Sequence, residues 1–203
     1  MKTLKNILIL FILISCSNDN KTGRDTLSKE TKTIQILPLG TVSKKNLDIV
    51  KNSIESFYGF NCIVLPKCEV TPDILSKSKT KYDAGKILKK YNIKSHTLIF
   101  TNVNICTKSR GFDEWSILGY GYQPGSICVV STNRMNKSNS KFKSRLEKVA
   151  LHEIGHNLDL PHCEFDEKCF MNDAKGTIKT FDTEKTWLCK NCCDLIGRSF
   201  VPF

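Results

Sequence analysis

The sequence has no apolar run long enough to cross a membrane. Its longest run, Ile7–Ile14, provides about 8 residues where a hydrocarbon core needs roughly 20. Lys2 and Lys5 precede this run, and Ser15 and Cys16 follow it. A positively charged start, a short apolar run and small residues after it are typical of a secretory leader. We therefore expect residues 1–15 to be a signal peptide.

The end of this leader looks like the lipobox of bacterial lipoproteins. The segment reads Leu13, Ile14, Ser15, Cys16, and in such proteins the cysteine becomes the lipidated first residue. Several acyl chains would anchor the protein stably, since a single chain binds a membrane only marginally. We expect an exported protein anchored through Cys16 to a bacterial membrane, on its periplasmic or cell-surface side. The alternative is an ordinary cleaved leader with an incidental cysteine.

The chain also lacks the aromatic pattern of a nucleic-acid-binding surface. Its formal net charge of +11 would suit nucleic acid, an anionic membrane or acidic substrates. However, the lysines are scattered, and no regular series of aromatic residues interleaves them as base stacking would require. We interpret the charge as a solvated basic surface and expect no nucleic-acid partner.

Internal repeats and low-complexity tracts are absent, and 203 residues with 40% hydrophobic content can bury one core. Residues 16–32 are polar and without periodicity, which predicts a flexible tether before a single domain over 33–203. Strands are predicted at Thr33–Leu39, Asn61–Leu65, His96–Asn102, Ile117–Tyr122 and Ile127–Thr132, and helices at Lys44–Tyr58, at Tyr82–Tyr91 and from Lys141 to about Leu158. Alternating strands and helices favour a mostly parallel sheet, with the last two strands as an antiparallel edge.

Histidine is scarce, and three of only four histidines lie between positions 152 and 162. His152 and His156 are four residues apart, so both imidazoles lie on one helical face and can bind one zinc ion. A catalytic zinc typically has three protein ligands and one open position for water. His162 can be the third ligand if the helix ends near Leu158 and the chain turns back.

Glu153 directly follows the first of these histidines. Its carboxylate could therefore hydrogen-bond a zinc-bound water, take its proton during attack on a carbonyl and pass that proton to the leaving amine. Zinc lowers the pKa of such a water to about 7. The pattern predicts a zinc-dependent peptidase with Glu153 as general base.

Ten cysteines are many for this length, and they could form disulfides, metal sites or both. Four of them form two pairs after the histidine cluster, Cys163 with Cys169 and Cys189 with Cys192. Four thiolates would make a structural zinc site and help to fold a segment poor in apolar residues. Disulfides remain the alternative.

The arrangement resembles the archaemetzincin family, a branch of the metzincin metallopeptidases. The family signature is HExxHxxGxxH, followed by a cysteine, a second cysteine, a methionine and a CxxC pair; the matching residues are His152, Glu153, His156, His162, Cys163, Cys169, Met171, Cys189 and Cys192. The resemblance continues upstream through YDAGKIL, LGYGY, VVS and RLEKVALHE.

This resemblance implies a metzincin-like α+β fold, with an upper subdomain (33–158), an active-site helix and a small Cys-rich lower subdomain (159–203). It implies two zinc ions per chain and a packing role for Met171 beneath the catalytic site. Asp159 stands where the family has glycine, so we expect it to adopt positive φ, at a cost of roughly 1–2 kcal/mol. Cys193 could replace Cys192 as a ligand. Disulfides among the remaining cysteines, Cys62, Cys68, Cys106, Cys128 and Cys193, cannot be predicted.

Three functions are compatible with these features. The first is a monomeric peptidase whose peptide or protein substrate pairs with an edge strand around Ile117–Gly121. The second is a pseudo-peptidase that keeps the metal and only binds peptides, which Asp159 would favour. The third is a zinc-ribbon nucleic-acid binder, for which three histidines and an adjacent glutamate are unnecessary.

Overall fold

The structure is a computed structural model that describes residues 32–93, 95–136, 140–175 and 177–202. The expected signal peptide, Cys16 and all of the expected tether except Lys32 lie outside the described residues. No helix among the described residues is long and apolar enough to cross a membrane. Thr31–Phe203 form one compact unit.

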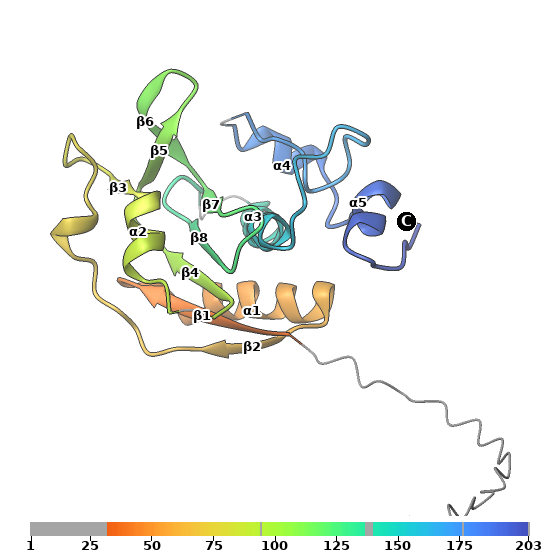
Figure 1. Cartoon of the computed structure of the whole chain (residues 1–203), viewed down its shortest axis with the longest axis horizontal. Coiled ribbons are helices and arrows are strands. Elements are labelled where there is room, and N and C mark those ends of the chain that lie inside the picture. The colour runs from red at the N-terminus through yellow and green to blue at the C-terminus, as the bar shows by residue number, and fades with distance from the viewer. Residues whose placement is uncertain (1–31, 94, 137–139, 176, 203) are drawn as a thin grey trace, which may run out of the picture. The chain divides into compact units, whose positions relative to one another are not determined.

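A five-stranded sheet forms the centre of this unit (Figure 1). Its strands, in spatial order, are β2 (Asn61–Val64), β1 (Thr33–Leu39), β4 (Thr97–Thr101), β8 (Ile127–Ser131) and β7 (Gly119–Gly121). The first four are parallel, and β7 pairs antiparallel with β8 at the edge. Every residue of β4 and β8 is buried, as expected for strands covered on both faces. The predicted α+β fold with an antiparallel edge strand is confirmed.

Helices cover both faces of the sheet, and the sheet separates the core into two layers. Helices α1 (Lys44–Tyr58) and α3 (Phe142–Asn157) pack against one face, where Ile36 and Phe100 are fully buried. Helix α2 (Ala84–Lys90) packs against the other face, with Leu39 and Ile99. Neighbouring residues of one strand point to opposite faces, so each buried strand supplies both layers.

A second sheet of three strands was not predicted. It has the order β3 (Tyr82–Asp83), β5 (Ile105–Ser109) and β6 (Phe112–Ile117). The predicted strand Ile117–Tyr122 is therefore wrong at its start, because Ile117 ends β6 and only Gly119–Gly121 joins the main sheet. The predicted helix at 82 starts later, because the Asp83 side chain caps α2 by accepting a hydrogen bond from the backbone N–H of Lys86.

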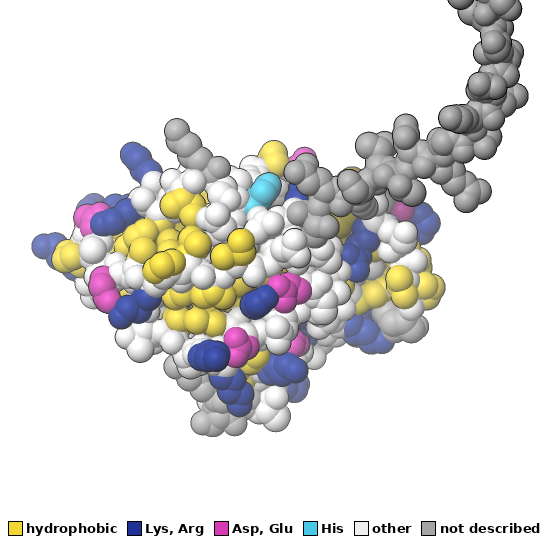
Figure 2. Space-filling model, turned by 90° about the horizontal axis from the view of Figure 1, so that it is seen from below, with side chains coloured by type: hydrophobic (Ala, Val, Ile, Leu, Met, Phe, Trp, Pro, Cys, Tyr) yellow, Lys and Arg dark blue, Asp and Glu magenta, His cyan; other side chains and the backbone are white. Residues whose placement is uncertain are grey.

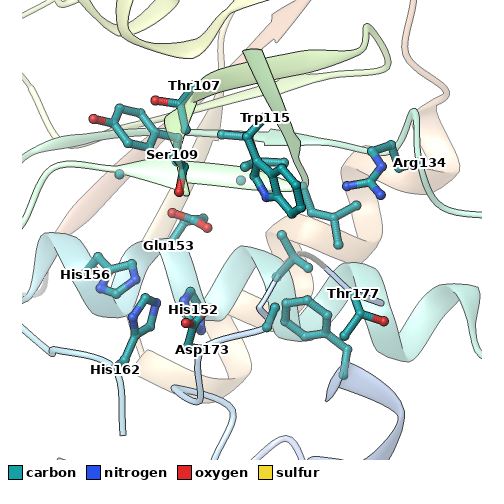
Figure 3. Close-up of a pocket in the computed structure, with 18 of the residues that line it drawn as sticks. Thr107, Ser109, Trp115, Arg134, His152, Glu153, His156, His162, Asp173 and Thr177 are labelled. Atoms are coloured by element: carbon teal, nitrogen blue, oxygen red, sulfur yellow. The ribbon is translucent and has the colours of Figure 1, made fainter. Parts of the chain in front are cut away.

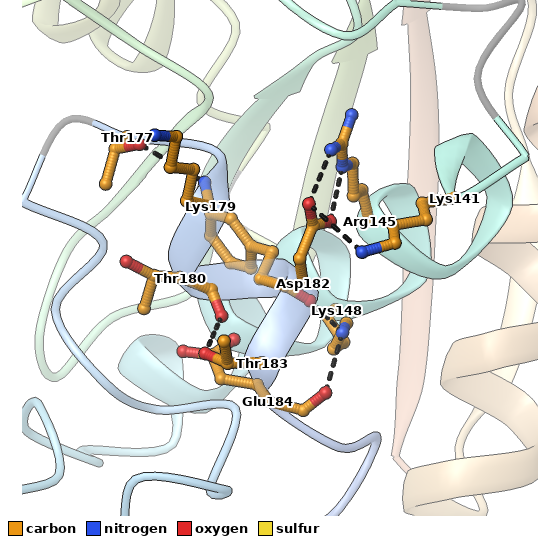
Figure 4. A network of polar contacts seen from close by, with 10 residues as sticks. Lys141, Arg145, Lys148, Thr177, Lys179, Thr180, Asp182, Thr183 and Glu184 are labelled. Atoms are coloured by element: carbon orange, nitrogen blue, oxygen red, sulfur yellow. Dashed lines mark hydrogen bonds and ion pairs between the residues drawn. The ribbon is translucent and has the colours of Figure 1, made fainter.

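The C-terminal segment, predicted to be irregular, contains two short helices, α4 (Lys179–Thr183) and α5 (Lys190–Leu195). Polar contacts attach α4 to α3 (Figure 4). Arg145 donates two hydrogen bonds of 2.7 Å to the carboxylate of Asp182. Lys148 donates to the backbone carbonyl oxygens of Phe181 and Glu184. These bonds fix Phe181 beside His152, at a ring-centroid distance of 6.3 Å.

One face of the molecule shows how its basic side chains are distributed, which matters for nucleic-acid binding. Figure 2 shows Lys and Arg side chains interspersed with Asp and Glu around a patch of hydrophobic side chains. The basic side chains on this face do not form the continuous stripe that binding to a phosphate backbone would favour.

Candidate metal centre

Helix α3 carries His152, Glu153 and His156 and ends at Asn157. Asp159 adopts a φ of 71°, so the predicted positive φ is confirmed. The backbone N–H of Leu160 then donates a 2.9 Å hydrogen bond to the carbonyl oxygen of Gly155. This tight turn reverses the chain and returns His162 to the other two histidines.

The three histidines could hold one metal ion. Each offers a ring nitrogen, and these three atoms all lie within 4.8 Å of one another. Nδ1 of His152 donates to the carbonyl oxygen of Phe170, and Nδ1 of His156 donates to that of Leu160, both at 2.8 Å. A carbonyl oxygen only accepts, so Nδ1 carries the proton and Nε2 keeps its lone pair for a metal.

The protonation state of the helix histidines also suits a metal. Burial lowers the pKa of His152 to about 3 and lowers the pKa of His156 as well. Both rings are therefore neutral at pH 7, as metal ligands must be. The donor set of three imidazoles fits zinc.

Glu153 lies between the histidines and strand β7. It is only 6% exposed, and its Oε2 has no hydrogen-bond partner among the described residues. Burial raises its pKa to about 8. A buried carboxylate oxygen without a partner is costly, so its retention here indicates a role toward a water or a metal in the adjoining cavity.

Two glycines of β7 make room for this carboxylate. A Cβ on Gly119 would lie 2.3 Å from Oε1 of Glu153, and a Cβ on Gly121 would lie 3.3 Å from Oε2. Both glycines were predicted as part of a family motif and of the substrate-binding edge strand, but their contact with Glu153 was not predicted. The alternation of glycines in LGYGY was the available signal, because glycine in a strand often marks a close approach.

The free edge of β7 faces the cavity beside Glu153. The carbonyl oxygen of Leu118 and the N–H of Tyr122 bond to β8, and Tyr120 pairs with Val129. Alternation in an antiparallel ladder therefore directs the N–H and C=O groups of Gly119 and Gly121 away from β8. An extended peptide could pair with these groups.

The cavity over the site has a volume of about 440 Å³ and is bounded by β7, the β5–β6 hairpin, α3 and the segment after Met171. In Figure 3 the three histidines lie together near the Glu153 carboxylate, and Trp115, Arg134 and Thr177 lie farther along the helix. Across its mouth, Arg110 of the hairpin forms a 2.9 Å ion pair with Asp173. The cavity can accept a peptide segment beside the histidines.

The four predicted cysteines converge on a second site. The Sγ atoms of Cys163, Cys169, Cys189 and Cys192 all lie within 4.8 Å of one another. Cys163 and Cys189 are 3.6 Å apart, and Cys169 and Cys192 are 3.8 Å apart. A tetrahedral zinc with bonds of about 2.3 Å would place its sulfur ligands about 3.8 Å apart. The geometry fits a structural zinc.

Cys193 does not belong to this cluster, since its Sγ contacts the carbonyl oxygen of Leu188 at 3.7 Å. None of the nine described cysteines forms a disulfide. The predicted packing role of Met171 agrees with the structure. Met171 is fully buried, and its Sδ lies so close to α3 that a Cβ on Gly155 would approach it to 2.5 Å.

Three converging histidines, a buried glutamate and a strand edge over one cavity define a zinc-dependent peptide hydrolase. Residues 46–198 match the model of peptidase family M54, so the chain belongs to this family. The archaemetzincins of Halobacterium salinarum and Archaeoglobus fulgidus are 26% and 27% identical to it, over 78% and 80% of this chain and 96% and 98% of theirs.

Solved structures agree with the sequence relatives. The crystal structure of archaemetzincin from Archaeoglobus fulgidus matches with a TM-score of 0.71 at 27% identity, over 81% of this chain and 99% of that one. That of archaemetzincin from Methanopyrus kandleri has the same fold, with a TM-score of 0.69 over 82% of this chain and 94% of that one. The chain is thus a zinc metallopeptidase, and its substrates are peptides or proteins.

The contact between Gly119 and Glu153 generates a first prediction. Gly119→Ala places a methyl group against Oε1, Cδ and Cγ of Glu153, and we expect this overpacking to destabilise the fold by about 1–3 kcal/mol. Thermal unfolding measures the effect. In a Glu153→Ala background the clash is gone, so the same substitution should cost almost nothing. If Gly119→Ala lowered the stability equally in the wild type and in the Glu153→Ala variant, the destabilisation would not come from contact with Glu153.

Proposed function

We propose that this protein hydrolyses peptide bonds with Glu153 as general base and general acid, and with His152, His156 and His162 as ligands of a catalytic zinc. The observation that carries the proposal is the buried Glu153 carboxylate, whose Oε2 is unpaired beside three converging histidines. When bound there, zinc polarises the substrate carbonyl and activates water.

The residues of the chain perform the remaining steps. The free backbone groups of Gly119 and Gly121 pair with the extended substrate, which holds its scissile carbonyl over the histidines. Glu153 accepts a proton from the attacking water and transfers it to the leaving amine. Burial raises the pKa of Glu153, which favours the protonated form that donates to the leaving amine. The positive charge of a zinc ion at the three histidines would lower this pKa, so that the carboxylate can first accept the proton.

The pseudo-peptidase remains the second candidate, because Asp159 replaces glycine at the turn. Two observations favour activity. Asp159 takes the positive φ that the turn requires, and the hydrogen bond from Leu160 to Gly155 closes the turn. Asp is among the few residues that tolerate this conformation, so the substitution costs stability without displacing His162.

A second zinc on Cys163, Cys169, Cys189 and Cys192 would organise the segment after α3. Each of these four cysteine residues is at most 6% exposed. A zinc ion bound to them would link the segment that carries His162 to α5. The ion would therefore fix the turn beneath the catalytic site. We therefore propose two zinc ions per chain, one at each cluster.

We also propose that the mature chain is a monomer anchored through a lipidated Cys16 on the outer side of a bacterial membrane. The support for the anchor is the lipobox-like segment Leu13–Cys16, which ends the apolar run, together with the polar segment that follows it.

The catalytic role of Glu153 is tested by Glu153→Ala. We expect turnover of a peptide library to fall about 10²- to 10⁴-fold while zinc content stays unchanged, since Glu153 is not a ligand. Zinc analysis by mass spectrometry and hydrolysis assays measure both. A variant that keeps wild-type turnover would contradict the general-base role, and tight peptide binding without turnover in the wild type would select the pseudo-peptidase.

The metal content separates the two sites. We expect about two zinc ions per wild-type chain and one after either His162→Ala or Cys192→Ala, because each variant loses one ligand of one site. Cys193→Ala is the matched control and should retain two. A wild-type chain with a single zinc would contradict the cysteine site.

The anchor is tested by Cys16→Ser in a bacterial host that processes lipoproteins. We expect the wild type in the membrane fraction and the variant in the soluble fraction, because the serine cannot take the thioether-linked lipid. Cys68→Ser, which leaves Cys16 intact, should stay with the membrane. Equal fractionation of all three proteins would contradict lipidation.

A further inference from the structure

The cavity extends past the histidines toward the beginning of α3. Val149, one helical turn before His152, lines this part together with Phe181, Ala174, Thr177 and the Trp115 ring of β6. This part, which we call the distal pocket, is mostly apolar in its walls. It lies next to His152, whose ring centroid is 6.3 Å from that of Phe181. A substrate side chain next to the cleaved bond could enter it.

Arg134 supplies a positive charge to the distal pocket. It lies just after β8, and its Nη1 donates a 2.7 Å hydrogen bond to the carbonyl oxygen of Ser116 in β6. This bond holds the guanidinium at the pocket wall, where Figure 3 shows it pointing into the cavity. A guanidinium has five N–H donors, so donors remain for a ligand.

The other cations of the cavity have acidic partners. Arg110 pairs with Asp173 at 2.9 Å, and Lys108 pairs with Asp113 at 3.4 Å. Arg134 forms no ion pair with any residue that the structure describes. Arg134 is thus the cation of the cavity that has no acidic partner among the described residues, and a carboxylate of the substrate would pair with it.

The direction of a bound peptide identifies which part of the substrate meets Arg134. Strand β7 runs along α3 from Gly119, beside Glu153, toward Gly125, where a Cβ would approach the side chain of Asn157 at the end of the helix. Antiparallel pairing is slightly more stable per residue than parallel pairing, and a peptide that pairs in this way with β7 runs in the opposite direction to the strand. Its residues after the scissile bond therefore lie toward Ser116, Arg134 and the distal pocket.

We propose that Arg134 selects peptides that carry a carboxylate on the C-terminal side of the cleaved bond. The carboxylate belongs either to an acidic side chain or to the end of the peptide. The apolar walls of Trp115, Val149 and Phe181 would pack on its methylene groups, and the guanidinium would bind its oxygens. The inference rests on the proposed peptidase activity and gives it a substrate class.

The test uses the zinc-loaded protein and quenched fluorescent peptides that differ at one position. The residue after the cleaved bond is Glu, Gln or Lys, and each peptide has either a free or an amidated C-terminus. Arg134→Gln removes the charge, Arg134→Glu reverses it, and Lys179→Gln is a control that removes one exposed charge outside the cavity. The readout is the ratio of kcat/KM for the Glu and Gln peptides.

We expect the wild type and Lys179→Gln to prefer Glu over Gln about two- to fivefold, because Arg134 is exposed and solvent screens its charge. Arg134→Gln should lose this preference, so that its ratio of kcat/KM for the Glu and Gln peptides falls to about one, and Arg134→Glu should prefer Lys. A preference that follows the free C-terminus rather than the side chain identifies the chain end as the carboxylate. An unchanged Glu-to-Gln ratio and an unchanged preference for the free C-terminus in Arg134→Gln overturn the inference.

Binding separates this inference from the proposed function. The same peptides are titrated into the Glu153→Ala variant with Arg134 present or replaced by Gln, and fluorescence anisotropy gives their affinities. Absence of turnover in the wild type refutes the peptidase, whereas loss of the Glu-over-Gln affinity ratio in the Arg134→Gln variant still supports the carboxylate contact. An affinity ratio that does not depend on Arg134 refutes it.

Discussion

The turn between Asn157 and His162 is the constraint on which the metal centre depends. A helix can place two histidines on one face, but a third ligand for the same ion must come from chain that reverses direction. The positive φ of Asp159 reverses the chain, and the hydrogen bond from the backbone N–H of Leu160 to the carbonyl oxygen of Gly155 holds the turn closed. The cysteine cluster holds the chain that follows, since Cys163 is the next residue after His162.

Close packing around α3 fixes the remaining geometry. Gly155 allows Met171 to lie directly against the helix, and Gly119 allows β7 to lie directly against Glu153. On the third side, the hydroxyl group of Tyr58 donates a 2.9 Å hydrogen bond to the carbonyl oxygen of Leu151 and links α1 to the helix. Helix α3 therefore has little freedom to move, and its ligands are held in place before a metal binds.

Much of this arrangement could be predicted from the sequence. Strand β1 and helices α1 and α3 show the apolar periodicity of their type, and β4 and β8 are short, mostly apolar runs. The spacing of His152, His156 and His162 indicates the metal site. The β5–β6 hairpin could not be predicted, because residues 107–114 are mostly polar and its two strands depend on pairing with each other. The roles of Gly119 and Arg134 depend on contacts between segments distant in sequence, which no local pattern reports.

The most direct test of the central claim is a crystal structure of the zinc-loaded protein, measured at wavelengths on both sides of the zinc absorption edge. Anomalous difference maps locate each zinc independently of the protein coordinates. We expect one peak about 2.0–2.1 Å from Nε2 of each of His152, His156 and His162, with the Glu153 carboxylate nearby but not bound to the ion. A map without zinc at the three histidines, or with His162 turned away from the ion, would contradict the account.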